Sequence, residues 1–251
     1  MKLQKFVHTR LTGVALIFFL AVCWEVAVRM GVTTSPSIPR VSTIFYTWGK
    51  LIVSGVIAEQ LGSSLYRMFI GYLIASMLGI FIGLMMGYFR FIDNLLEPIV
   101  ELLRPIPTPA YIPIAILLLG LGTEMKVFLI AAATFFPVLL NTYSGVRLVD
   151  PVQINTGRTF CLSPTEILWK IILPSTIPQI FTGLRISLGI GLIMVVISEM
   201  VAANSGIGYF ILQAQRTFEV SQMYAGIFTL GVAGYLLNFI FIHVEKRIVH
   251  W

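Results

Sequence analysis

Charged side chains are scarce in this chain of 251 residues, because Asp, Glu, Lys and Arg together make up only 11% of it. A soluble domain carries about 25% charged residues. Hydrophobic residues account for 57% of the chain and the mean hydropathy is +0.92, which is typical of a membrane protein. The apolar runs also lack the period-two alternation of barrel strands. The sequence therefore predicts an all-α, polytopic membrane protein.

Cysteine and histidine are also rare. Cys23 and Cys161 have no metal-ligand spacing, and we expect neither a disulfide nor a metal site. The three histidines lie near or beyond the ends of apolar runs, which leaves no Ser/His pair or metal cluster at one depth in a membrane. The Gly206–Gly208 pattern lacks the Lys-Ser/Thr of a phosphate-binding loop. We expect a non-enzymatic chain without a cofactor, so that any ATP and Mg²⁺ would be bound by another polypeptide.

About six apolar runs are long enough to cross a bilayer as helices, since a span needs roughly 20 residues. The third is interrupted by four prolines, which leave only Ala110–Leu121 uninterrupted, about 18 Å of helix against a core of ~30 Å. Either part of the preceding helix enters the membrane, or the backbone there lines protein or water. The runs are Leu11–Met30, Ser64–Tyr88, the interrupted third reaching Leu121, Met125–Val146, Thr182–Ala202 and Met223–His243.

The first run follows basic residues and resembles a signal peptide in that respect. It ends in Ala27-Val28-Arg29-Met30 without a small-x-small cleavage site, so we expect an uncleaved anchor over residues 11–30. With a cytoplasmic N-terminus, eleven of the 17 Lys and Arg residues lie at inside ends and loops and six outside. The positive-inside rule favours this arrangement, which places both termini in the cytoplasm. The net charge of +6 fits anionic lipid better than nucleic acid.

Residues 150–178 form a less apolar island that we expect in the cytoplasm. Asp150, Pro151 and Gln153 predict one helix start, and Ser163, Pro164 and Glu166 predict a second, each with a capping box. The second helix should end or kink before Pro174. A bend near Cys161-Leu162 would expose Ile154, Phe160 and Leu162. An amphipathic loop on the lipid surface would need more basic residues, so we favour an elbow that docks a soluble partner.

Glu199 is the most informative single residue. It lies about 20–24 Å along its span, and an ionisable group in a span is a functional candidate unless it is paired or wet. It either accepts hydrogen bonds from the amides of the turn at Asn204–Gly208, or contacts a substrate in a pathway or gate, or relays protons. If it serves the turn, Gln should retain much of the activity. For Glu25 we expect a local partner.

Gly79, Gly83 and Gly87 form a small-residue stripe along the second run. Such stripes let two helices approach closely in a membrane. We therefore expect this face to pack against another helix.

Several separated segments resemble the permease subunits of ABC importers of the nitrate, taurine and aliphatic-sulfonate type. They follow the order and spacing of that family from about Thr34 to Trp251. The segments are "SPSIPRV" at 35–41, "SLYRMFIGYLIASMLGIFIGLMMG" at 64–87, "LLRPIPTPAYIPIAILLLGLG" at 102–122, "FFPVLLNTYSGV" at 135–146, "ILWKIILPSTIPQIFTGLRISLGIGL" at 167–192 and "SEMVAANSGIGYFI" at 198–211.

The resemblance implies that the cytoplasmic island holds the coupling helices that contact an ATPase subunit. The family pattern has Glu-Ala-Ala, three residues, Gly, nine residues and then Ile-x-Leu-Pro. Here Ile171–Pro174 matches the end of the pattern, Asn155-Thr156-Gly157 replaces Glu-Ala-Ala, and Cys161 replaces the Gly. Either the bend is made without a left-handed glycine, or the ATPase partner is unusual. The expected coupling residues are Asn155, Thr156, Gly157, Phe160, Cys161, Leu162 and Ser163.

By this resemblance the chain is a single permease domain over 1–251, with an anchor at 11–30, a core at about 60–245, the elbow at 150–178 and a type I ABC importer fold. It would form the pathway for a small, anionic solute in the cell inner membrane. Its implied partners are two ATPase subunits, a second copy of itself and a solute-binding protein. The alternatives are a proton-coupled secondary transporter that uses Glu199 or Glu25, and a membrane scaffold that recruits a soluble partner through the elbow.

Overall fold

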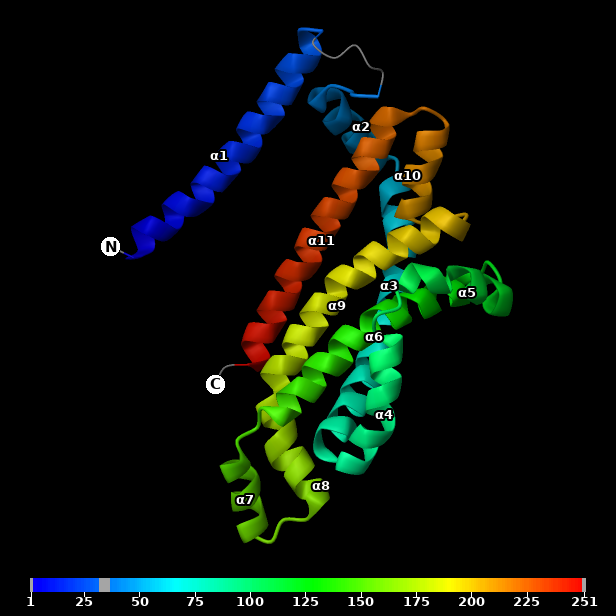
Figure 1. Ribbon diagram of the computed structural model, residues 1–251. Coiled ribbons are helices and arrows are strands. Elements are labelled where there is room, and N and C mark those ends of the chain that lie inside the picture. Colours follow the sequence, from blue (N-terminus) through cyan, green and yellow to red (C-terminus); the bar gives the residue numbers. More distant parts are fainter. Residues whose placement is uncertain (1, 32–36, 250–251) are drawn as a thin grey trace. The chain divides into compact units, whose positions relative to one another are not determined.

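The computed structural model describes residues 2–31 and 37–249, so the motif at 35–41 lies partly outside the described residues. Within these two ranges the regular elements are helices and no strand occurs (Figure 1). In chain order they are α1 (Lys2–Arg29), α2 (Val41–Val53), α3 (Val56–Tyr88), α4 (Arg90–Leu103), η1 (Thr108–Tyr111), α5 (Ile112–Leu119), α6 (Thr123–Arg147), α7 (Pro151–Thr159), α8 (Pro164–Ile167), η2 (Leu168–Ile172), α9 (Leu173–Ala202), α10 (Ile207–Arg216) and α11 (Val220–Ile248).

In the described part of the chain, five helical segments are long and apolar enough to cross a membrane, and a bent pair makes a sixth candidate. The bent pair consists of Arg90–Leu103 and Thr108–Leu119, which meet at 88°. Five of the predicted runs are recovered, although the second begins at Val56 instead of Ser64 and the fifth extends back to Pro164, and the interrupted third corresponds to the bent pair. The all-α, multi-span class predicted from the sequence is confirmed.

The described chain divides into two compact units. One comprises the residues up to Glu59 with Phe210–Thr229, and the other comprises Gln60–Tyr209 with the residues from Leu230 onward. The assignment of a single permease domain, with the anchor, core and elbow boundaries given above, stays a prediction.

In the first unit, Glu25 has the local partners that we expected. Its carboxylate pairs with Arg29 one turn further along α1, at 2.7 Å, and accepts hydrogen bonds from the backbone N–H and the hydroxyl of Ser42. Elsewhere in this unit the indole of Trp48 donates to Thr229 at 3.0 Å and its ring packs edge-on against Phe228. These contacts tie α1 to the start of α2, and α2 to α11.

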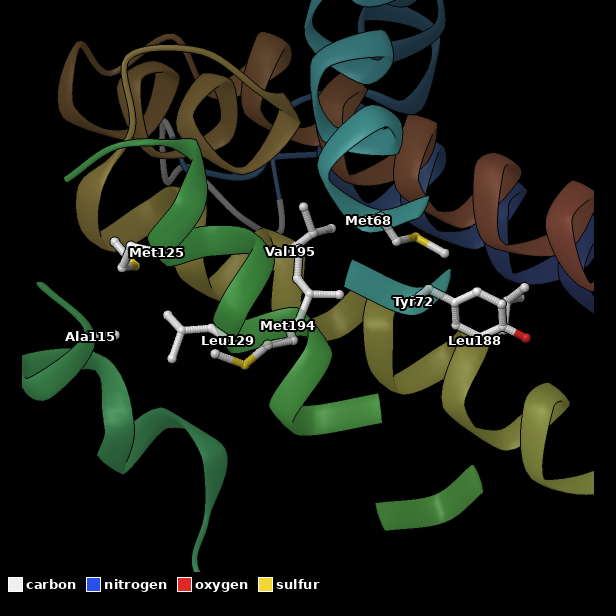
Figure 2. Packing of buried hydrophobic residues seen from close by; sticks show 9 residues of the cluster. Met68, Tyr72, Ala115, Met125, Leu129, Leu188, Met194 and Val195 are labelled. Carbon is white, nitrogen blue, oxygen red and sulfur yellow. The ribbon is translucent and has the colours of Figure 1, made fainter. Parts of the chain in front are cut away.

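The core of the second unit lies where α3, α5, α6 and α9 meet (Figure 2). Flexible methionines fill much of this space, which suits the irregular gaps between crossing helices. The buried side chains are Met68 and Tyr72 of α3, Ala115 of α5, Met125, Leu129 and Ile130 of α6, and Leu188, Met194 and Val195 of α9.

The glycine stripe of α3 packs directly on α6. A Cβ added at Gly83 would lie 2.8 Å from the backbone oxygen of Leu139, and one added at Gly87 would lie 2.5 Å from Cβ of Val146. No side chain fits at these separations, so the helices approach as closely as they do because the stripe is glycine. The packing interpretation of the stripe is confirmed.

The helix that begins at Pro164 does not end at Pro174, so of the two expected outcomes, an end or a kink before the proline, the first is wrong. Proline lacks an N–H and its ring clashes with the carbonyl four residues earlier. Here a π-helical turn, Leu168–Ile172, precedes the proline, and the Leu173 N–H donates to the Leu168 carbonyl five residues back. This wider turn accommodates Pro174, so that α8, η2 and α9 form one helical segment over Pro164–Ala202.

Candidate functional site

The first half of the elbow is α7, whose start follows its sequence signals. The side chain of Asp150 accepts a hydrogen bond from the Val152 N–H at 2.8 Å, and Pro151 occupies the first turn. The predicted role of Gln153 in a capping box is wrong, because its side-chain oxygen instead accepts from the hydroxyl of Ser175 at 3.2 Å. Gln153 thereby connects α7 to the beginning of α9.

The bend of the elbow is a Schellman motif with cysteine in the place usually held by glycine. The Leu162 N–H donates to the Gly157 carbonyl at 3.1 Å, and the Cys161 N–H donates to the Arg158 carbonyl at 2.9 Å. Cys161 adopts φ +55°, a left-handed conformation that costs a residue with a Cβ about 1–2 kcal/mol. The bend is therefore made without a left-handed glycine, which is the first of the two alternatives left by the sequence, and Cys161 supplies the left-handed conformation instead.

The second half of the elbow begins at Ser163 with the predicted capping box. The Glu166 N–H donates to the Ser163 hydroxyl, and the Ser163 N–H donates to the Glu166 carboxylate at 3.0 Å. The same carboxylate pairs with Lys170 at 2.8 Å. Both ends of the bend are thus held by local hydrogen bonds, which makes the elbow a defined shape that a partner can recognise.

The exposed surface of the elbow differs from the expected one. Phe160 is exposed to 76%, as expected, but Ile154 and Leu162 pack against the cluster formed by Val146, Val149, Ile167, Leu168 and Ile172. The amphipathic pattern of a nine-residue helix was too short to show which apolar residues face inward. Val152 and Trp169 are further exposed apolar side chains of the elbow that the sequence did not predict, and Leu148, just before it, is exposed as well.

The other expected coupling residues divide between exposed and buried positions. Asn155 and Thr156 lie exposed on α7, where the Thr156 hydroxyl donates to the Val152 carbonyl at 2.8 Å. Gly157 is buried, and a Cβ added there would lie 2.6 Å from Cδ1 of Ile171. The surface available to a partner is therefore Asn155, Thr156 and Phe160, with Cys161 and Ser163 exposed at the bend.

Glu199 lies near the opposite end of α9 and is only 1% exposed. Its carboxylate forms an ion pair with Arg67 of α3 at 2.6 Å and accepts a hydrogen bond from the hydroxyl of Ser64 at 2.8 Å. It also accepts from the Gly208 N–H at 3.0 Å. The expectation that Glu199 accepts hydrogen bonds from amides of the Asn204–Gly208 turn is therefore confirmed for one amide, that of Gly208.

The other polar groups of the turn at Asn204–Gly208 are held by α3. Arg67 donates to both the carbonyl and the hydroxyl of Ser205, at 2.9 and 2.6 Å. The Gly206 N–H donates to the side chain of Gln60, and the Ile207 N–H to the Ser64 hydroxyl. The positive and negative charges are matched and the buried donors have acceptors, which is what a buried ion pair requires. The arrangement fastens the α9–α10 turn to α3.

Sequence reasoning missed Gln60, Ser64 and Arg67 as the partners of this site. Arg67 is one of the six Lys and Arg residues that the expected topology places outside, and nothing in its local sequence points to a buried partner. A comparison of how deep each polar residue lies in the membrane could have found the pair. Ser64 and Arg67 lie at the beginning of α3 and Glu199 lies near the end of α9, and the expected topology places both of these helix ends on the same side of the membrane. Lys126 was also missed as a buried residue, with its ammonium group donating to the carbonyls of Leu121 and Gly122.

A single helical segment joins the elbow to this network. Glu199 follows Ser163 by 36 residues of the Pro164–Ala202 helix, or about 50 Å at 1.5 Å per residue. Figure 1 shows α8 continuing into α9 beside α6, with α7 beyond the end of α6. The second half of the elbow and the Glu199 carboxylate thus belong to the same helical segment.

The sequence profile of the binding-protein-dependent transport system inner membrane component matches residues 75–250. The chain belongs to this family. Its members are permease subunits, so this permease is a multi-pass protein of the inner membrane and a component of an ABC importer of the sulfonate, taurine and nitrate type. The membership confirms the resemblance read from the separated motifs.

Three curated relatives are similar over most of the permease. The putative aliphatic sulfonates transport permease protein SsuC of Bacillus subtilis is 33% identical over 239 residues, which cover 95% of this chain and 87% of SsuC. The taurine transport system permease protein TauC of Escherichia coli is 34% identical over 193 residues, 77% of this chain and 70% of TauC. The nitrate import permease protein NrtB of Synechococcus elongatus is 31% identical over 250 residues, covering 95% and 86%.

The fold is similar to that of a solved importer. A chain of the MetNI methionine ABC transporter in an inward-facing conformation superposes with a TM-score of 0.65 at 17% identity, covering 74% of this permease and 93% of that chain. This likeness establishes the type I importer permease fold.

Proposed function

We propose that this permease lines the translocation pathway of an ATP-driven importer for a small anionic solute. Two copies of the chain would pair with two cytoplasmic ATPase subunits, with both chain termini on the cytoplasmic side. A solute-binding protein would deliver the solute on the opposite side. The relatives are named for aliphatic sulfonates, taurine and nitrate, which all carry an anionic oxygen-rich group, a sulfonate or a nitrate, and this supports a cargo with such a group.

The observation that carries the proposal is the continuity of the elbow with α9. A partner that moves the exposed surface at Phe160 moves a helix whose far end holds Glu199. The Glu199–Arg67 pair in turn fastens the α9–α10 turn to α3. Nucleotide binding in the ATPase would thereby bias the bundle between inward-open and outward-open states, as expected for a two-state element. In this scheme Glu199 positions a gate and does not bind the anion.

The pairing of the two membrane carboxylates argues against the proton-coupled alternative. Glu25 and Glu199 each contact an arginine within 2.7 Å, and both carboxylates also accept hydrogen bonds from backbone N–H groups, so each one is already engaged in holding neighbouring segments together. The alternative of a non-transporting scaffold does not explain why a buried ion-pair network at Glu199 lies on the same helical segment as the elbow.

Uptake by the reconstituted complex tests the proposal. Proteoliposomes that contain this permease with its ATPase and binding protein should accumulate a labelled sulfonate, taurine or nitrate only when ATP is supplied. Uptake should survive collapse of the proton gradient. Transport that persists without ATP and stops with the proton gradient would support the secondary transporter, and the absence of any uptake with an intact ATPase complex would favour the scaffold.

A further inference from the structure

A second left-handed residue occurs at the turn between α10 and α11. The Glu219 N–H donates to the Ala214 carbonyl at 2.9 Å, and the Phe218 N–H donates to the Gln215 carbonyl at 3.2 Å. This is again a Schellman motif, and Phe218 occupies its left-handed position with φ +60°. A bulky residue is rare in this conformation, whereas glycine adopts it without strain.

Packing of the Phe218 ring within this chain does not offset the strain of the left-handed backbone, because the side chain is 87% exposed. Polar neighbours surround it, since Arg216, Thr217 and Glu219 are exposed as well. Beside the ring lies a hollow of about 360 Å³, which is also lined by Thr47 of α2 and by Glu219, Ser221 and Gln222. An exposed aromatic ring with a polar rim and an adjoining hollow is the usual anatomy of a protein–protein contact.

From the order of the spans along the chain we expect the turn on the side of the membrane opposite the elbow. The segment Pro164–Ala202 crosses between them, and α10, with ten residues, is about 15 Å long and too short to cross back. Insertion of the ring into lipid would bring the adjacent carboxylate of Glu219 toward the hydrocarbon, which is unfavourable. A soluble partner that approaches from the side opposite the ATPase fits this surface better.

We propose that Phe218 and the adjoining hollow form a contact for the solute-binding protein. The inference rests on the proposed function, since only an importer receives its solute from such a partner. Phe218 would enter an apolar pocket of the binding protein, while Glu219, Ser221 and Gln222 supply polar contacts at the rim. A strained backbone conformation persists where the surrounding structure and the function require it. Here the left-handed conformation of Phe218 accompanies a ring that is exposed to solvent.

The test uses the full complex in nanodiscs and the purified binding protein encoded with the permease. The measured quantity is the concentration of binding protein that gives half-maximal stimulation of ATP hydrolysis. Phe218→Ala and Phe218→Gly should each raise this concentration about tenfold or more. The glycine variant is decisive because it removes the backbone strain and so cannot act by weakening the turn.

The outcomes separate the inference from the proposed function. Phe91→Ala is the matched control, since Phe91 is an exposed phenylalanine at the start of α4 and outside both sites, and it should leave the half-saturating concentration unchanged. If the wild type and Phe218→Gly need the same concentration of binding protein for half-maximal stimulation of ATP hydrolysis, the docking contact at Phe218 is wrong, whereas the proposed importer function is unaffected. No stimulation of the wild type would remove the proposed function and the inference together.

A spectroscopic variant distinguishes the binding protein from the lipid. In Phe218→Trp, the added indole emission, relative to the wild-type complex, should shift when the binding protein is added and should not be quenched by brominated lipid. Quenching by brominated lipid would place the ring in the bilayer and overturn the inference.

Discussion

At the scale of single residues, Glu199 is held both by an ion pair with Arg67 and by a hydrogen bond from the Gly208 N–H. Replacing Glu199 by Gln keeps an acceptor for the Gly208 N–H but leaves the Arg67 guanidinium buried without its carboxylate. Breaking a buried pair from one side costs about 3 kcal/mol or more. We therefore expect Glu199→Gln to lower the unfolding temperature and uptake, which reverses the expectation from the sequence alone.

The double variant Arg67→Gln with Glu199→Gln provides the control. Two neutral amides leave no uncompensated charge, so thermal unfolding in nanodiscs should recover toward the wild type, and uptake in part. A proton relay would stay inactive in both variants, because neither amide titrates. Recovery of stability without any uptake would thus contradict the structural role assigned to Glu199.

Cys161 offers a residue-scale test of backbone strain. Cys161→Gly should stabilise the bend by about 1 kcal/mol, since glycine adopts the left-handed conformation without a Cβ clash. Cys161→Ala keeps the Cβ and should bring no gain. Hydrogen exchange of the Leu162 amide, which donates to the Gly157 carbonyl, reports the local change. Equal protection in the two variants would show that the turn is unstrained.

At the scale of elements, the elbow should transmit force only while Phe160 contacts its partner. Phe160→Asp places a charge at the expected interface without disturbing the packed side of α7, so the ATPase should dissociate from membranes that still contain the permease. Phe160→Leu, which stays apolar, should retain the ATPase. Leu162→Asp differs, because Leu162 packs inward, and it should unfold the elbow itself. Co-sedimentation with the membrane and limited proteolysis separate the two effects, and an ATPase that stays bound to Phe160→Asp removes the docking role.

The contact between α3 and α6 gives a matched pair of glycine variants. Gly83→Ala must push the helices apart, since the new Cβ would lie 2.8 Å from the Leu139 carbonyl oxygen, and it should destabilise by about 1–3 kcal/mol. Gly189→Ala, on α9 with nothing within 4 Å of an added Cβ, should be neutral or slightly stabilising. Thermal unfolding of the two variants decides, and a Gly83→Ala variant as stable as Gly189→Ala would contradict the close packing.

The elements also show which parts of the structure a sequence can predict. Signals that act over a few residues succeeded, including the Asp150 cap, the capping box at Ser163 and the glycine stripe. Expectations failed where the outcome depends on a turn type or on tertiary packing, as for Gln153, whose side chain accepts from Ser175 of α9 instead of completing a capping box. Pro174 is accommodated by a π-helical turn, and Ile154 and Leu162 are covered by residues from other helices. The Arg67–Glu199 pair joins residues 132 apart, which no local pattern reports.

At the scale of the whole molecule, the position of the elbow depends on the bent pair α4 and α5. If the two arms together cross the bilayer, the chain has six crossings and the elbow lies on the same side as the N-terminus. If they return to the side they left, there are five, and the elbow lies opposite the N-terminus. The docking of a cytoplasmic ATPase, with the N-terminus in the cytoplasm, requires the first arrangement.

The native thiols permit a direct test of this arrangement. Cys161 is exposed on the elbow, and Cys23→Ser removes the thiol of α1. In this background a membrane-impermeant maleimide should label inverted vesicles at Cys161, and intact right-side-out cells should stay unlabelled. Val53→Cys, at an exposed position after α1 has crossed, should show the opposite pattern when Cys161 is also replaced by Ser. Added ATPase should protect Cys161 from the reagent. Labelling of Cys161 and of the Val53→Cys thiol from the same side would mean that α4 and α5 form a re-entrant loop, and the elbow could not then meet an ATPase in the cytoplasm.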